Sequence, residues 1–329
     1  MPTIYPSSFR IHPLSSPLNA TVRVPGSKSL TNRALLISAL ADGTTRLTNA
    51  LFSDDSRYFA SALQNLGFDI QLDEPNREMT VTDLGGRIPA TQAELFIGNA
   101  GTAARFLTAF LTLGHGEYLL DGDSRMRERP IDDLVEALSQ LGASVSPLSP
   151  RERAEGEGNV TICPPIKILA NGLRGGKTSI AGDISSQFLS ALLMVAPYAH
   201  SPVEIELTTD LNSKPYVDMT LSIMKDFGVE VEHNGYRSFT IRPSRYFPLS
   251  TFQIESDASA ASYFFAAPAI CGGGTVRVEN ISRHSVQGDI KFLDLLSQMG
   301  CTVQETDNCI LVTGHSRLRG IDVDMRDIP

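Results

Sequence analysis

Basic side chains stand at an expected helix start in the first part of this chain of 329 residues. Lys28 follows the turn Pro25-Gly-Ser, and Arg33 comes about one helical turn later. Backbone N–H groups at a helix start attract anions, a lysine adds a point charge for phosphate, and an arginine fork matches a carboxylate. The glycine spacing of a Walker A loop is missing. The turn therefore predicts a small-anion site and gives no support for nucleotide hydrolysis.

A second turn of this kind runs from Gly98 to Arg105 as Gly-Asn-Ala-Gly-Thr-Ala-Ala-Arg. It is similar to a degraded dinucleotide-binding fingerprint, with Asp121 near the position of a ribose-binding acid, but the middle glycine is absent. A Gly101-Thr pair at a helix start, with an arginine one turn later, is more typical of an anion cradle. Together the two turns favour a substrate with more than one anionic group.

Three arginines alternate at positions 125, 127 and 129, just before a helix expected near Pro130. For an isolated run of this kind, a solvated loop paired with Asp123 and Glu128 is the more ordinary interpretation. Because this run follows two turns suited to anions, we favour anion binding. The residues alone predict a small, multiply anionic substrate and do not name its reaction.

Neutral donors stand at two later helix starts, in Ser185-Ser-Gln and in Ser213-Lys-Pro-Tyr. Serines at such positions are most often plain N-caps, and a functional role is the alternative. The six histidines show no metal-ligand spacing, and no Gly-x-Ser-x-Gly elbow is present. The sequence therefore predicts neither a metal centre nor the commonest kind of serine hydrolase.

The composition excludes several classes of partner. Lys and Arg number 28 against 37 Asp and Glu, a net charge of −9, so there is no basic field for nucleic acid. The longest nearly apolar stretch, residues 188–199, is too short to cross a bilayer. The four cysteines include no Cys-x-x-Cys pair, which fits reduced thiols. We therefore expect a cytoplasmic protein that binds neither membranes nor nucleic acid.

One segment of alternating strand and helix recurs four times along the chain. Each copy opens with a short strand and a turn, and the four turns start at Gly26, Gly98, Gly182 and Ser256. A second helix in each copy ends in a glycine suited to positive φ, at Gly67, Gly142, Gly228 and Gly300. Strands are expected after these glycines, as at 229–232, and also at 321–325. The next turn falls due near residue 330, so we expect the sequence to be incomplete.

The helices of each copy differ in their apolar pattern. The first helices, such as residues 34–41 and 188–196, are apolar nearly all round and should be enclosed on every side. The second helices are amphipathic, with Phe59, Leu63 and Leu66 on one face. Alternating stretches after the capping glycines are typical of strands with one wet face. The pattern predicts an α/β protein with helices buried and sheets outside.

Several motifs in this order resemble the 5-enolpyruvylshikimate-3-phosphate synthase family, the 3-phosphoshikimate 1-carboxyvinyltransferases. The resemblance covers about residues 13–329. It rests on Pro25-Gly-Ser-Lys-Ser-Leu-Thr-Asn-Arg, Gly98-Asn-Ala-Gly-Thr-Ala-Ala-Arg, Arg125-Met-Arg-Glu-Arg-Pro, Ser185-Ser-Gln-Phe-Leu, Ser213-Lys-Pro-Tyr and Gln287-Gly-Asp. The sister UDP-N-acetylglucosamine enolpyruvyl transferases are disfavoured, because their reactive cysteine loop has no counterpart here.

The resemblance implies a two-domain inverse α/β barrel built from βαβαββ repeats, with the second domain incomplete. A segment bounded by prolines, at 243–248, separates the third and fourth copies. In the family the first strand returns to the second domain. We therefore expect one domain at 21–244, with three repeat units and most of the shikimate 3-phosphate site, and a second at 1–20 plus 245–329.

The resemblance also implies an activity in the shikimate pathway to aromatic amino acids. The family transfers the enolpyruvyl group of phosphoenolpyruvate to the 5-hydroxyl of shikimate 3-phosphate and releases phosphate. These two substrates are the expected partners, no cofactor or metal is expected, and the complete protein is expected to be a monomer. Phe106 stands where the family often has a proline, a position that bears on glyphosate sensitivity.

Substrate-binding roles follow from the matching motifs. By the resemblance, Lys28 would touch both substrates, and Ser29 with Arg33 would hold the shikimate carboxylate. Gly101 and Arg129 would contact phosphoenolpyruvate. Fixed cations would be needed at such a site, because two substrates rich in phosphate and carboxylate groups would otherwise repel one another.

The remaining assignments concern the phosphate of shikimate 3-phosphate. By the resemblance, three hydroxyls would hold it, those of Ser185, Ser186 and Ser213. Gln187 would reach toward both molecules, with Asn99 and Tyr216 as neighbours.

The family's acid/base aspartate immediately follows an Ile-Pro pair like the one at 328–329, where this sequence ends. General acid/base work needs a positioned group of suitable pKa. No substitute is apparent, so we expect no catalytic residue in this chain and poor activity of the chain alone. The alternative is a truncated, non-catalytic module that binds shikimate 3-phosphate.

Overall fold

A computed structural model of the chain describes residues 8, 10, 12–14, 16–148, 151–152, 160–306, 308–325 and 328. The α-helices in this part are α1 (Lys28–Ser38), α2 (Asp54–Asn65), α3 (Gly101–Leu111), α4 (Asp132–Gln140), α5 (Ser186–Val195), α6 (Lys214–Asp226), α7 (Ala258–Ile270) and α8 (Phe292–Met299). Short 3-10 helices are η1 (Met126–Glu128), η2 (Ala196–Tyr198) and η3 (Gly288–Lys291). None of these helices combines the length and apolar character that crossing a bilayer requires.

The strands of the described residues alternate with these helices. They are β1 (Leu18–Arg23), β2 (Asp42–Thr48), β3 (Asp69–Asp73), β4 (Glu78–Leu84), β5 (Gln92–Phe96), β6 (His115–Asp121), β7 (Ser144–Pro147), β8 (Arg151–Glu152), β9 (Val160–Thr161), β10 (Ile166–Asn171), β11 (Gly176–Ile180), β12 (Val203–Leu207), β13 (Glu232–Asn234), β14 (Ser238–Ile241), β15 (Thr251–Gln253), β16 (Gly274–Glu279), β17 (Thr302–Thr306) and β18 (Cys309–Gly314). β8 and β9 form a separate two-stranded pair.

Four sheets share one strand order. They are β15-β2-β4-β3, β5-β6-β10-β7, β11-β12-β14-β13 and β1-β16-β18-β17. In each sheet the first pair is parallel and the other two pairs are antiparallel. The predicted fourfold repeat and the α/β class are therefore confirmed.

The first strands of two repeat units are exchanged. β1 precedes α1 in the sequence but pairs in parallel with β16, with Leu18 opposite Gly274. β15 precedes α7 but pairs in parallel with β2, with Thr251 opposite Arg46. The expected return of residues 1–20 is confirmed for Leu18–Ala20, and the pairing runs on to Arg23, past the predicted limit. Residues 8, 10, 12–14, 16 and 17 belong to no strand, and the rest of that prediction, residues 1–7, 9, 11 and 15, lies outside the described residues.

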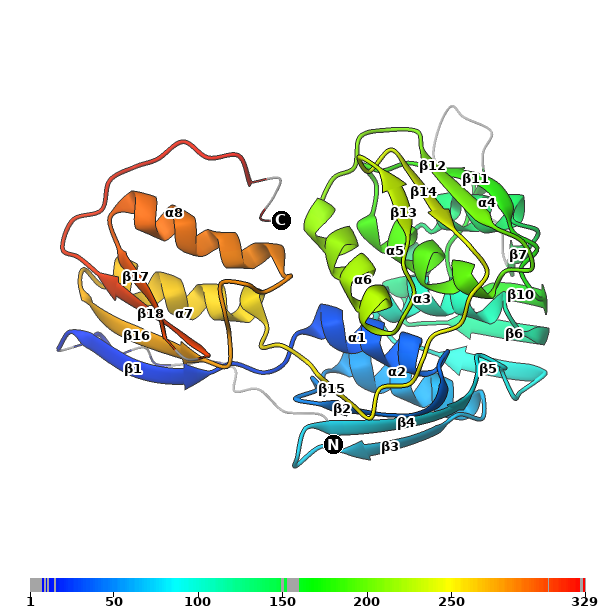
Figure 1. Cartoon of the computed structure of the whole chain (residues 1–329), viewed down its shortest axis with the longest axis horizontal. Helices are drawn as coiled ribbons and strands as arrows, with labels where there is room; N and C mark the ends of the chain where they lie inside the picture. Colours follow the sequence, from blue (N-terminus) through cyan, green and yellow to red (C-terminus); the bar gives the residue numbers. More distant parts are fainter. Residues whose placement is uncertain are drawn as a thin grey trace.

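The hydrophobic side chains form two clusters. The larger draws on buried residues between Leu30 and Ile254, and the smaller on Val24 and buried residues between Ala258 and Val312. Figure 1 shows two corresponding bodies, with β1, α7, α8, β16, β17 and β18 in the smaller one. The chain crosses between the clusters at residues 24–27 and 254–257, later than the predicted limits at 20/21 and 244/245. The division into domains itself stays a prediction.

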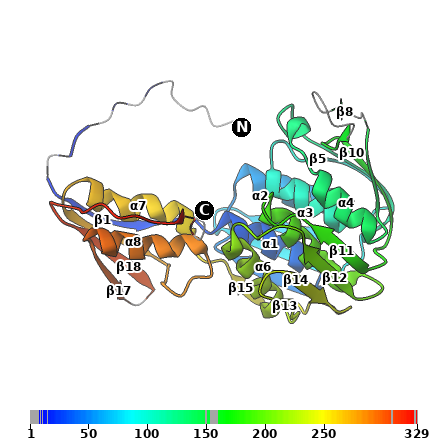
Figure 2. The ribbon, with the colours of Figure 1, turned by 90° about the horizontal axis from the view of Figure 1, so that it is seen from above.

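The first helix of each repeat unit is more deeply buried where more sheets surround it. Every residue of α1 from Leu30 on and of α5 from Phe188 on is buried, as predicted from their apolar patterns. Figures 1 and 2 show α1, α3 and α5 inside the larger body, with its three sheets toward the outside. α7 is equally apolar, yet Tyr263 and Ile270 are 79% and 81% exposed. The expectation of full enclosure is wrong for α7, because the smaller body supplies one sheet only within the described residues.

The ends of the second helices agree with the prediction, but two predicted strands do not form as expected. The four capping glycines have φ of 93°, 93°, 87° and 108°, at Gly67, Gly142, Gly228 and Gly300. The strand expected at 229–232 starts only at Glu232, because the Val229 N–H donates to Met224 O and completes the end of α6. Residues 321–325 form no strand, and no described strand pairs with them.

The two crossings lie side by side and lead directly into α1 and α7. The Ser27 N–H donates to Glu255 O at 2.8 Å, and the Asp257 N–H donates to Pro25 O at 2.9 Å. A Cβ on Gly26 would lie 1.8 Å from Asn49 O, so only glycine fits this crossing. The crossings thereby fix where α1 begins.

Candidate functional site

A pocket of about 500 Å³ opens at the starts of α1, α3 and α5, within the size range of small-molecule sites. Six of the predicted residues line it, namely Lys28, Asn99, Gly101, Arg129, Ser185 and Gln187. The other lining residues are Asp55, Thr102, Arg105, Pro130, Ile184 and Phe188. Three helix starts that meet at one pocket direct backbone N–H groups and positive dipole ends toward it.

The helix starts at the pocket are capped to different degrees. Ser27 and Ser185 cap α1 and α5, because their hydroxyl oxygens accept from Leu30 N and Gln187 N. α3 begins after Ala100 without any side-chain cap. Its first N–H groups therefore remain available to a ligand.

Two guanidinium groups converge on the start of α3. A Cβ on Gly101 would lie 2.6 Å from Arg129 Nη1 and 3.4 Å from Arg105 Nη1. Arg105 Nη1 donates to Gly101 O at 3.1 Å, and the Arg105 guanidinium lies 5.9 Å from the centre of the Phe188 ring. The close approach of Arg129 requires the missing Cβ of glycine.

The positive charges of Arg105 and Arg129 favour binding of an anion between them. Burial, and next the positive charge of Arg129, lower the pKa of Arg105 to about 10, and Cys163 opposes the shift. Neither arginine pairs with a carboxylate of the described residues. Arg105 Nε is buried and has no hydrogen-bond partner there. Two like charges held together without a counter-ion bind phosphate or carboxylate favourably.

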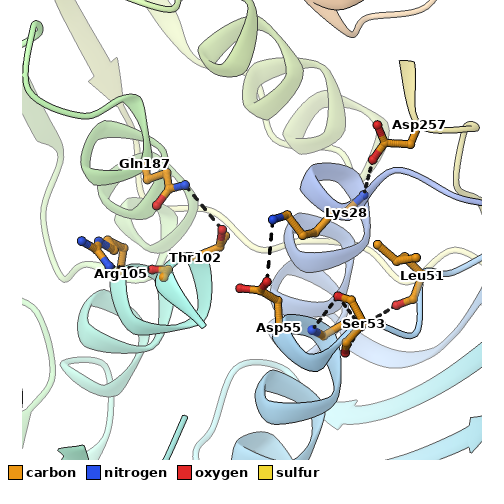
Figure 3. Close-up of polar contacts among 10 residues, drawn as sticks. Lys28, Leu51, Ser53, Asp55, Thr102, Arg105, Gln187 and Asp257 are labelled. Carbon is orange, nitrogen blue, oxygen red and sulfur yellow. Dashed lines mark hydrogen bonds and ion pairs between the residues drawn. The ribbon is translucent and has the colours of Figure 1, made fainter. Parts of the chain in front are cut away.

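A lysine and a carboxylate face this pair across the pocket. Lys28 Nζ lies 3.7 Å from Asp55 Oδ2. Figure 3 shows Lys28 and Asp55 on one side and Gln187, Thr102 and Arg105 on the other. Gln187 Nε2 donates to Thr102 Oγ1 at 3.4 Å, linking α5 to α3. With Arg129 included, the three cations outnumber the single carboxylate of the lining.

Arg33 does not line the pocket and is only 1% exposed. Its guanidinium donates to Thr220 Oγ1 at 2.7 Å, to Ser29 O at 3.0 Å, and to Ser190 Oγ and Tyr216 O at 3.2 Å. Burial lowers its pKa to about 10. Arg33 thus joins α1 to α5 and α6, and its role with Ser29 toward a shikimate carboxylate stays a prediction.

Phe106 is fully buried on α3. The Arg33 guanidinium lies 5.5 Å from the centre of its ring, a cation–π contact. The Phe59 ring lies 6.4 Å away on α2. This aromatic side chain therefore packs against the Arg33 guanidinium, and its bearing on glyphosate sensitivity stays a prediction.

Three other predicted residues do not line the pocket. Ser213 has a left-handed φ of 56° and lines a neighbouring cavity of about 770 Å³. Ser186 is the first residue of α5 and is half-buried. Burial, and next the charge of Asp289, raise the pKa of Tyr216.

Sequence reasoning missed Asp55 and Ile184 and left Arg105 without an assigned role. Asp55 stands in the first turn of α2, where an acidic residue is ordinary, so no sequence signal set it apart. Arg105 belongs to the second predicted anion turn and could have been assigned from it. No group of three or more His, Cys, Asp or Glu suited to a metal occurs among the described residues.

Comparisons with known proteins show the family of the chain. The family model of EPSP synthase (3-phosphoshikimate 1-carboxyvinyltransferase) matches residues 14–329. A 3-phosphoshikimate 1-carboxyvinyltransferase of Shewanella piezotolerans is 49% identical over 325 residues, covering 98% of this chain and 73% of the relative. One of Sulfurovum is 50% identical over 314 residues, covering 95% and 71%. The solved EPSP synthase of Acinetobacter baumannii has a TM-score of 0.76 at 24% identity, covering 95% of this chain and 69% of that one.

Proposed function

Because the chain belongs to the EPSP synthase (3-phosphoshikimate 1-carboxyvinyltransferase) family, we infer that it transfers the enolpyruvyl group of phosphoenolpyruvate to the 5-hydroxyl of shikimate 3-phosphate and releases phosphate. It is a transferase of the shikimate pathway to aromatic amino acids. Relatives with this enzyme name match nearly the whole chain, which favours turnover over a module that only binds.

The observation that carries the site assignment is the unpaired arginine couple at the start of α3. Phosphoenolpyruvate carries a phosphate and a carboxylate, and its charges match Arg105, Arg129 and the uncapped N–H groups around Gly101. Lys28 lies opposite and would touch both substrates. Asn99 would complete this side of the pocket.

The second substrate is proposed to lie on the α5 and α6 side. Its phosphate would be held by Ser185, Ser186 and Ser213, and Gln187 would reach both molecules. Tyr216 would lie beside its ring, and its carboxylate would be held by Ser29 and Arg33. Closure of the smaller body over the pocket would exclude water and strengthen these charge interactions.

The finer architecture belongs to the same proposal. The buried helices and the common strand order support a two-domain inverse α/β barrel of βαβαββ repeats. The two core clusters support domain limits near residues 24–27 and 254–257. A cytoplasmic monomer completes the proposal.

The test combines product detection with a matched pair of arginine variants. The wild-type chain, incubated with both substrates, should yield product and inorganic phosphate in ³¹P NMR spectra. Arg129→Ala should raise KM for phosphoenolpyruvate by on the order of 100-fold, because a charge-assisted double hydrogen bond is lost.

Arg125→Ala is the control, since Arg125 belongs to the same arginine run, is exposed and does not line the pocket. It should leave KM within about twofold, as expected for a surface substitution. Equal effects of the two variants on KM would contradict the proposed site. A wild-type chain that neither forms product nor binds the substrates would contradict the proposed function.

A further inference from the structure

Two loops of the larger body meet beside the pocket through a small hydrogen-bonded cluster. One loop, residues 181–185, joins β11 to α5, and the other, residues 208–213, joins β12 to α6. We name the group Asp183, Thr209 and Asn212 the loop clasp. The first loop ends at Ser185 and the second ends at Ser213.

The hydroxyl of Thr209 is the centre of the loop clasp. Its oxygen accepts from Gly182 N at 2.9 Å and from Asp183 N at 3.2 Å. The same hydroxyl donates to Asp183 Oδ1 at 2.6 Å. One side chain of the second loop therefore holds two backbone N–H groups and a carboxylate of the first loop.

Asn212 adds a second set of contacts between the loops. Its N–H donates to Gly182 O at 3.0 Å, and its Nδ2 donates to Asp183 O at 3.3 Å. A Cβ on Gly182 would lie 2.8 Å from Thr209 O and 3.1 Å from the Cα of Leu211. The two backbones are thus in direct contact, and the clasp fixes their separation.

The residue that follows the clasp is held in an uncommon conformation. Ser213 has a φ of 56°, which non-glycine residues rarely adopt unless the surrounding structure imposes it. Its side chain does not cap α6. Ser185, at the end of the other loop, lines the 500 Å³ pocket, while Ser213 lines the neighbouring cavity. The clasp residues precede the serine along each loop.

We propose that the loop clasp, through the Thr209 hydroxyl, positions the serine hydroxyls that receive the phosphate group of shikimate 3-phosphate. The inference rests on the proposed function, which assigns Ser185, Ser186 and Ser213 to that phosphate. Thr209 is a positioning residue in this scheme. Without it, the two loops would have to be ordered when the ligand binds, and this ordering would weaken affinity for the phosphate.

The clasp also keeps a carboxylate away from the phosphate. Asp183 is exposed, and an ionised carboxylate turned toward a phosphate would repel it. The hydrogen bond from Thr209 holds Oδ1 of Asp183 against the second loop. Loss of the Thr209 hydroxyl therefore both loosens the serines and frees a negative charge near them.

Thr209→Val removes the hydroxyl at nearly constant volume, and calorimetry of shikimate 3-phosphate and of shikimate measures the effect. We expect affinity for shikimate 3-phosphate to fall about tenfold or more, and affinity for shikimate to stay within about twofold, because only the first ligand carries the phosphate. Thr209→Ser restores the hydroxyl and should recover most of the affinity.

Thr208→Val is the matched control. Thr208 is the exposed neighbour on the same loop, and its hydroxyl makes no hydrogen bond among the described residues. It should bind both ligands like the wild type.

Equal losses for both ligands in Thr209→Val, or no loss for either, would overturn the proposed role of the clasp. A wild-type chain that binds neither ligand would instead overturn the proposed function, so the two failures are distinguishable. Failure of Thr209→Ser to recover affinity would also contradict a role for the hydroxyl.

Discussion

Gly101 shows how one missing side chain shapes the candidate site. Its backbone φ is not in the left-handed region, so alanine fits the backbone, but the added Cβ would lie 2.6 Å from Arg129 Nη1. Gly101→Ala should therefore displace Arg129 and raise KM for phosphoenolpyruvate about tenfold, an effect of roughly 1.4 kcal/mol, with little change in Tm. Gly320→Ala, where a Cβ meets nothing within 4 Å, is the control. A KM unchanged in Gly101→Ala would argue against contact between Arg129 and the substrate.

Arg33 is buried among hydrogen-bond acceptors of α5 and α6, and we expect it to contribute to stability. Its guanidinium donates to the buried oxygens of Thr220, Ser190 and Tyr216, which keep their hydrogen bonds to one another when it is removed. Arg33→Ala should lower the free energy of unfolding by roughly 3–5 kcal/mol in urea titrations, because several hydrogen bonds from a charged donor are lost and a buried cavity is left behind. Arg57→Ala, at an exposed ion pair with Glu74, should cost less than about 1 kcal/mol. Equal stability of the two variants would show that the Arg33 contacts contribute little.

The sequence indicated which side chains carry charge but not where each one points. Lys28 and Arg33 both stand in the first two turns of α1, yet only Lys28 reaches the pocket. α1 is enclosed on nearly all sides, so its apolar pattern has no polar face from which the direction of Arg33 could be predicted.

The capping box of α2 supports the helix that carries Asp55, the carboxylate facing Lys28. Ser53 accepts from Ser56 N, and the Ser56 hydroxyl accepts from Ser53 N. Ser53→Ala should lower the free energy of unfolding by about 1 kcal/mol, measured by urea titration. Ser61→Ala, on the exposed middle of α2, should be neutral or slightly stabilising, because alanine favours helix. A neutral Ser53→Ala would show that the box adds nothing to α2.

The hydrophobic pattern and the spacing of glycines predicted the helices, their capping glycines and the repeat. They did not predict that β1 and β15 exchange sheets. β1 and β15 are both short strands followed by a turn and an apolar helix, so nothing local distinguishes the sheet that each joins. Their partners are fixed by packing between segments more than 200 residues apart. The family resemblance supplied this information for β1.

The two hydrophobic clusters, and the bodies built around them, should differ in stability. The smaller one contains far fewer buried side chains, and α7 leaves much of its apolar surface exposed. In hydrogen exchange with increasing urea, peptides from α7 and β16 should lose protection before those from α1, α3 and α5, because local opening follows local burial. Loss of protection at one common urea concentration would mean that the bodies unfold as a single unit.

The stability of the protein should depend on pH through the carboxyl group of Asp289, which lies in η3 and whose charge acts on Tyr216 of α6. Burial raises the pKa of Asp289 above its usual 3.8, the Ser259 hydrogen bond lowers it, and the charge of Asp257 raises it. A carboxyl that holds its proton more tightly when folded makes stability fall as pH rises from about 4 through the folded pKa. Asp289→Asn should therefore raise Tm relative to wild type at pH 7, and the gain should vanish below about pH 4.

Asp69→Asn, at an exposed position of β3, is the control for the substitution itself and should change Tm little at pH 7, as expected for a surface position. A gain for Asp289→Asn that is the same at pH 4 and pH 7 would contradict the titration of this carboxyl.

The exchange of β1 and β15 has a consequence for synthesis on the ribosome. β1 is made among the first segments, but its partner β16 starts at Gly274, and β2 likewise waits for β15 at Thr251. At about 5–20 residues per second, a nascent chain carries β1 unpaired for roughly 13–50 s. During that time each half-built sheet offers an open edge to other nascent chains. Neither body can be completed before most of the polypeptide has been translated, so chaperone protection during elongation matters more for this topology than for two domains built in sequence order.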